Sequence, residues 1–67
     1  MKIETFWHNK DEFIPNSPMH INPAHIIMIR HSPTLKRWFI KLTEQKTRFY
    51  INNEDLHQVV ESIGGNL

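Results

Sequence analysis

The sequence predicts an α+β fold, in which a small antiparallel β-sheet of four or five strands is closed by one C-terminal amphipathic helix. Three features support this prediction: a helical apolar stripe near the end of the chain, an alternating apolar segment before it, and a length of 67 residues. A chain of this length forms one domain, so we expect residues 1–67 to fold around a single small core.

The C-terminal helix is expected over residues 53–63. Its apolar residues recur at the i, i+3, i+4 and i+7 spacing of one helix face: Leu56, Val59, Val60 and Ile63. This spacing predicts a stripe that packs on one side of the sheet. Asn52 or Asn53 is the expected N-cap, because an Asn side chain accepts hydrogen bonds from the first free backbone N–H groups. Gly64 and Gly65 mark the end of the helix.

The segment before the helix is expected to form a β-hairpin from residues 37–43 and 47–51. Apolar and polar side chains alternate in the first of these strands, so Trp38, Ile40 and Leu42 point to the core side of the sheet. The apolar stripe of the helix is one-sided, so the helix can cover only this face of the hairpin.

Three further strands are expected at residues 3–7, 19–21 and 25–31, where β-branched and aromatic side chains are frequent. Residues 8–18 are expected to form a polar turn followed by an irregular connection. The reason is that the prolines in this stretch donate no backbone hydrogen bond to a sheet.

The most apolar run in the chain is residues 26–29. Both of its faces are apolar, so we expect it to be buried on both sides, either as a central strand or as a strand at a subunit interface. If the helix covers one side of the sheet, a second apolar face stays open, and open apolar surface of this kind marks a binding partner. The predicted interface residues are Ile26, Met28, Phe39 and Tyr50.

Charge is distributed unevenly along the chain. Residues 30–48 contain six basic residues against Glu44 alone, a net charge of +5, whereas residues 49–67 contain three acidic residues and neither Lys nor Arg. A basic segment of this kind binds an anionic partner, or the acidic surface of another subunit. The predicted binding residues for an anionic partner or nucleic acid are Arg30, Lys36, Arg37, Lys41 and Arg48.

The sequence carries no recognisable catalytic or metal-binding motif. The absence of cysteine removes disulfides and thiolate ligands, and His20, His25 and His31 lack the i, i+4 spacing of a helical zinc site. No serine lies in a Gly-x-Ser-x-Gly turn, and both glycines of the chain lie near its C-terminus, which excludes a glycine-rich phosphate loop. We therefore expect a non-enzymatic protein without a metal or another cofactor.

The expected compartment is the cytoplasm. No apolar run approaches the roughly 20 residues of a transmembrane helix. The first residues of the chain also lack the apolar stretch of a signal peptide. We therefore expect no membrane partner.

Three functions are compatible with these features. The first is a small interaction or regulatory module that self-associates as a homo-oligomer and binds a protein partner. The second is a nucleic-acid-binding regulator, in which the basic hairpin 30–48 contacts phosphates and exposed aromatic rings stack on bases. The third is an oligomer that binds a small anionic ligand where Arg30, Arg37 or Arg48 of different subunits converge.

Residues 21–29, with the sequence INPAHIIMI, are followed by the hairpin 38–51 and the helix 56–63. This order of strand, Asn-Pro turn, strand, hairpin and short closing helix resembles the small FlbD/SwrD-like flagellar-associated proteins. It is also similar to the C-terminal β-rich part of LytTR-type DNA-binding domains. The resemblance covers residues 19–63 and implies a regulatory or DNA-contacting role without catalytic residues.

Overall fold

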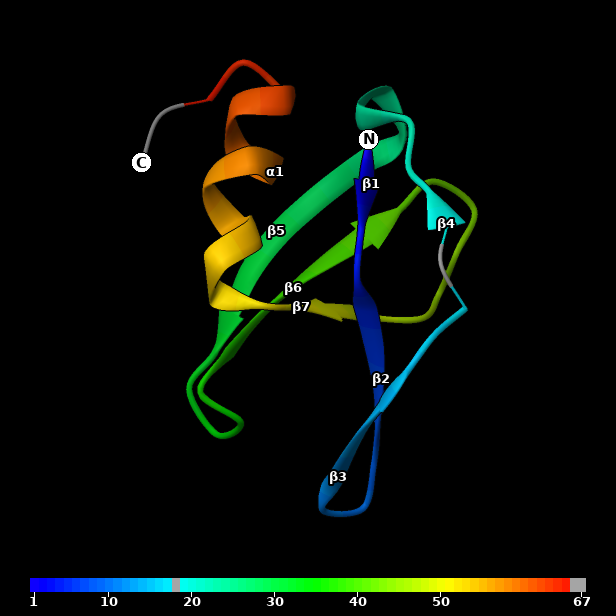
Figure 1. Ribbon diagram of the computed structural model, residues 1–67, viewed down its shortest axis with the longest axis vertical. Coiled ribbons are helices and arrows are strands. Elements are labelled where there is room, and N and C mark those ends of the chain that lie inside the picture. The colour runs from blue at the N-terminus through cyan, green and yellow to red at the C-terminus, as the bar shows by residue number, and fades with distance from the viewer. Residues whose placement is uncertain (18, 66–67) are drawn as a thin grey trace.

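A computed structural model describes residues 1–17 and 19–65 of the chain (Figure 1). Its strands are β1 (Lys2–Ile3), β2 (Thr5–Asn9), β3 (Glu12–Pro15), β4 (Met19–His20), β5 (Ile26–Ser32), β6 (Arg37–Leu42) and β7 (Phe49–Ile51). Short 3-10 helices lie at Pro23–His25 and Asn53–Asp55, and the second leads directly into the α-helix α1 (Leu56–Ser62).

Among the described residues, five strands form an antiparallel sheet in the order β3-β2-β7-β6-β5, and β1 pairs with β4 in a separate two-stranded sheet. The order in the sheet differs from the order in the chain, because the last strand, β7, lies in the middle between β2 and β6. The α-helix follows β7 and packs on one face (Figure 1). This arrangement confirms the predicted α+β class with a small antiparallel sheet and a C-terminal helix.

The face of the sheet that α1 covers holds the main hydrophobic core. Its buried members come from the N-terminal strand, the connection before the first 3-10 helix, the two central strands and the helix: Ile3, Ile21, Ile40, Leu42, Ile51 and Val59. Trp38 is half-buried against this cluster, as the alternation of its strand predicts. The core side of the hairpin was therefore predicted correctly.

The helix is shorter than the predicted span 53–63, because its first turn is a 3-10 helix and α1 ends at Ser62. Val59 and Val60 are buried, but Ile63 is 44 % exposed and does not complete the stripe. Neither expected Asn cap forms: the side chain of Asn52 makes no cap hydrogen bond at the 3-10 turn, and α1 is preceded by Asp55. In the described part of the chain, no helix has the length and apolar character needed to cross a membrane.

The predicted irregular connection at residues 8–18 is wrong for its middle part, which forms β3. Pro15 pairs with Phe6 at the end of this strand. Proline has no backbone N–H to donate to a neighbouring strand. It is compatible with this position because β3 is an edge strand, with a neighbour on one side only.

Of the two positions predicted for residues 26–29, the central strand is wrong, and the strand at a subunit interface stays a prediction. These residues begin β5, which is the opposite edge strand. Ile27 is 63 % exposed and Met28 is 37 % exposed. The register of β5 against β6 shifts between Ile26 and Met28, so Ile27 is an extra residue in a β-bulge. The bulge explains why an apolar run without alternation forms an edge strand.

The face of the sheet away from α1 is not open at Phe39 and Tyr50, which are only 3 % and 6 % exposed. Their rings contact each other with centroids 5.5 Å apart, and Phe13 of β3 lies 5.3 Å from Tyr50. His8 contacts both Phe13 and Tyr50, at 5.2 and 6.3 Å. The expectation that these two aromatic residues stay exposed is therefore wrong, because neighbouring strands cover them with aromatic side chains.

The two isoleucines at positions 40 and 27 provide a matched test of this architecture. We expect Ile40→Ala to lower the free energy of unfolding by about 2–5 kcal/mol, because Ile40 is fully buried and its truncation leaves a cavity. We expect Ile27→Ala, the same change at an exposed position, to lower it by less than about 0.5 kcal/mol. Urea unfolding followed by tryptophan fluorescence measures both values, and equal losses would contradict the core described here.

Candidate interaction surface

The strand register places the predicted basic residues on one face of the sheet. Arg30 lies directly opposite Phe39, and Lys41 lies opposite Met28. Residues directly opposite each other on paired strands point to the same face. Arg30, Phe39 and Lys41 therefore share the face that lies away from α1. Lys36 lies in the turn between β5 and β6 and is exposed.

Arg37 is held by contacts within the chain. Its guanidinium carbon lies 4.7 Å from the ring centre of Phe6 and 4.4 Å from that of Phe13, so the cation is packed against two aromatic rings. Its Nη2 donates a hydrogen bond of 2.7 Å to Oδ1 of Asn52. Nδ2 of Asn52 in turn donates to Oε2 of Glu4 at 3.3 Å. Arg37 is thus part of the folded framework, and Asn52 links it to the N-terminal segment.

Arg48 has a similar but more exposed position. Its guanidinium carbon lies 4.8 Å from the centre of the Phe39 ring, while the residue as a whole remains exposed. The stacked guanidinium helps to bury Phe39, and the exposed part of the side chain still presents N–H donors. Arg48 therefore covers the aromatic cluster and also contributes to the charge of this surface.

Three cations consequently share the face on which Phe39 lies: Arg30 opposite it on β5, Lys41 two residues further along β6, and Arg48, whose guanidinium lies over the ring. The strands β5, β6 and β7, which form this part of the face, contain neither Asp nor Glu. The surface therefore has one sign of charge and attracts anionic groups.

The outer edge of β5 adds an apolar feature to this charged face. Ile27 and Met28 are exposed at its beginning, whereas Ile26 is half-buried against the core. Of the four predicted interface residues, Met28 is therefore the one that is exposed. Ile27 was not among the predicted residues, because the bulge that turns it outward depends on the pairing with β6 and has no signal in the local sequence.

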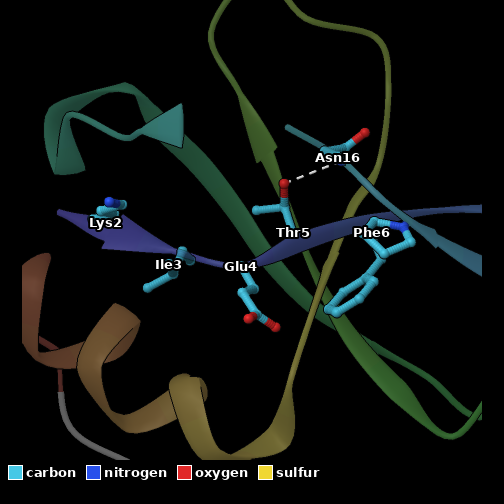
Figure 2. A pocket seen from close by; sticks show the side chains of 7 residues that line it. Lys2, Ile3, Glu4, Thr5, Phe6 and Asn16 are labelled. Atoms are coloured by element: carbon cyan, nitrogen blue, oxygen red, sulfur yellow. Dashed lines mark hydrogen bonds between the residues drawn. The ribbon is translucent and has the colours of Figure 1, made fainter. Parts of the chain in front are cut away.

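A cavity of about 560 Å³ lies at the junction of β1 and β2. Its wall consists of Lys2, Ile3, Glu4, Thr5, Phe6, Pro15 and Asn16. Asn16 Nδ2 donates a hydrogen bond of 3.0 Å to the Thr5 hydroxyl, and Figure 2 shows the side chains of Thr5 and Glu4 pointing to opposite sides of the segment. The volume is that of a small-molecule site, but the polar groups of the wall do not converge on one point, so the cavity indicates no class of ligand.

The histidines do not assemble into a metal site in the part of the chain that the structure describes. No group of three or more His, Asp or Glu residues there is arranged to hold a metal ion. His31 instead contacts the Trp38 ring, with centroids 5.1 Å apart, and His8 belongs to the aromatic cluster around Tyr50. Both histidines therefore take part in packing contacts with aromatic rings.

The link between Arg37 and Asn52 can be measured with a double-mutant cycle. We expect Arg37→Met and Asn52→Ala to be coupled by about 1–2 kcal/mol in the free energy of unfolding, because the hydrogen bond to a charged group is lost in either variant. Asn53→Ala is the matched control, and its coupling to Arg37→Met should stay below about 0.5 kcal/mol. Equal coupling of the two asparagines would contradict the specific role of Asn52.

Comparison with models of known protein families, with curated proteins and with solved structures finds no match. The resemblance to flagellar-associated proteins and DNA-binding domains therefore stays a prediction from the order of elements.

Proposed function

We propose that the chain is a non-enzymatic protein-interaction module, in which the outer edge of β5 takes up an additional strand from a partner. The partner strand comes from a second copy of the chain or from another protein. The observation that supports this proposal is that β5 lies at the edge of the five-stranded sheet and exposes Ile27 and Met28 beside a basic face.

An edge strand presents backbone N–H and C=O groups that have no partner strand on one side. An extended segment can add to such an edge, with main-chain hydrogen bonds giving affinity and side-chain contacts giving selectivity. The seven residues of β5 exceed the four of β3 at the other edge, which is further limited by Pro15. The edge of β5 is therefore the better template.

The β-bulge restricts which part of β5 can pair. The register against β6 is regular from Met28 to Ser32, and it is irregular before Met28. Bulges commonly protect an edge against indiscriminate pairing. The regular part is therefore the expected docking segment, and Arg30 lies at its centre.

The two alternative functions receive less support from the geometry. A nucleic-acid surface with stacked bases requires exposed rings, but Phe39 and Tyr50 are buried. An anionic-ligand site between subunits that used Arg37 would have to take its guanidinium from Phe6, Phe13 and Asn52. The basic residues that remain accessible are compatible with a partner of negative charge.

Photo-crosslinking tests the proposed surface. We expect the photoreactive amino acid benzoylphenylalanine at position 27 to give crosslinks, either between two copies of the chain or to another protein in cells that express it. The same amino acid at position 58, an exposed position on α1, is the control and should give fewer. Mass spectrometry should map the crosslinked peptide of this chain to β5.

Sedimentation equilibrium then separates the two kinds of partner. A dimer that dissociates in Ile27→Lys indicates a second copy, because the substitution places a charge at an apolar contact. A monomer that still crosslinks in cells indicates another protein. The absence of crosslinks from position 27, both in the purified chain and in cells, would contradict the proposed function.

A further inference from the structure

We infer that the strand taken up by β5 is an extended acidic peptide, in which carboxylate residues alternate with apolar ones. This inference rests on the proposed function and specifies the chemistry of the partner. It depends on the register of β5, on the charge of the face beside it, and on the apolar character of the opposite face.

The register determines which side chains an added strand would meet. Along the regular part of β5, Met28 and Arg30 point to the basic face, because they lie opposite Lys41 and Phe39. Ile29 lies opposite Ile40 and so points to the other face, beneath α1. In an added antiparallel strand, directly opposed residues have Cβ atoms about 4.5–5.5 Å apart, so alternate side chains would meet these two different environments.

On the basic face the environment favours carboxylates. A residue opposite Arg30 would lie beside its exposed guanidinium, in the field of Lys41 and Arg48. The strands β5, β6 and β7 contain no acidic residue that would neutralise these cations. Opposite charges on directly paired strand positions stabilise the pairing, and like charges destabilise it. A partner strand with Lys or Arg at these positions is therefore disfavoured.

On the other face the environment is apolar. Ile29 is half-buried against the core, and His31 packs on Trp38 with ring centroids 5.1 Å apart. Apolar side chains of the added strand would extend the hydrophobic core and bury more of the Ile29 side chain. Acidic residues on one face and apolar residues on the other give the alternating pattern.

A second copy of the chain fits this edge less well than an acidic peptide. In a symmetric antiparallel pairing of two β5 strands, the residues that meet on the basic face are drawn from Met28, Arg30 and Ser32 of each copy. None of these is acidic, so Arg30 would find no carboxylate in the partner strand. Charge complementarity therefore favours a strand from another protein.

Backbone amide NMR of the isotope-labelled chain provides the test. The probe is a synthetic peptide that alternates glutamate with valine and threonine, and we expect it to shift amide signals of residues 28–32 while leaving those of α1 unchanged. The same peptide with lysine in place of glutamate should bind about tenfold more weakly or not at all. N-methylation of the acidic peptide should abolish binding, since it removes main-chain donors.

A matched pair of charge reversals tests the role of Arg30. We expect Arg30→Glu to weaken binding of the acidic peptide about tenfold, because it places like charges opposite each other. Lys10→Glu changes the net charge equally at the turn between β2 and β3, by the opposite edge of the sheet, and should leave the affinity within about twofold. Equal effects of the two reversals would show unspecific attraction and would overturn the inference.

Other outcomes separate this inference from the proposed function. Equal binding of the acidic and lysine peptides, with crosslinks still formed at position 27, would make the inferred chemistry wrong but leave the β5 surface in place. A dimer joined through β5 would also overturn the inference that the partner is an acidic strand. The same holds for a single-stranded oligonucleotide that binds more tightly than the acidic peptide and requires Arg30. The proposed function itself would be contradicted if no peptide shifted the amide signals of β5 and position 27 gave no crosslinks.

Discussion

The packing of the Arg37 guanidinium against two phenylalanine rings is the contact on which the rest of the structure depends. Phe6 and Phe13 come from the N-terminal strands, whereas Arg37 begins β6 and reaches them from the other side of β7. Asn52 extends the connection to Glu4, 48 positions away in the chain. A guanidinium suits this position because its planar faces are weakly hydrated and stack on rings while its edges donate hydrogen bonds. One side chain of β6 therefore contacts both β2 and β3, which lie on the other side of β7.

This connection lets a short chain cover both faces of its sheet. A domain of 67 residues has too few residues to add a second layer on each side. The helix buries one face. On the other face, aromatic side chains pack on one another, and arginines stack on two of the rings; the cluster consists of His8, Phe13, Phe39 and Tyr50. The proposed partner strand would consequently meet the outer edge of β5 and the basic residues beside it.

The local sequence patterns predicted the fold class, the core side of the hairpin and the existence of the C-terminal helix, because alternation and helical spacing are local properties. They did not predict that Tyr50 is buried by Phe13, since this depends on the order of the strands in the sheet. The helix-cap interpretation of Asn52 failed for the same reason, because a distant Arg37 and Glu4 engage its side chain. The basic residues are recognisable from composition, but only the order of the strands separates Arg37, which packs on rings of β2 and β3, from Arg30, which lies on the edge strand and is exposed.

The central position of β7 has a consequence for how the chain folds during synthesis. The strand pairs formed by β2 with β3 and by β5 with β6 are local hairpins, but β7 is the strand that joins them, and it ends at Ile51. Isolated hairpins are marginally stable in water, so neither half persists until β7 has been synthesised. Pairing of Thr5 with Ile51 then closes a long loop, which is a slow step for a domain of this size. The nascent chain therefore forms its five-stranded sheet after β7 has been synthesised, rather than one hairpin at a time.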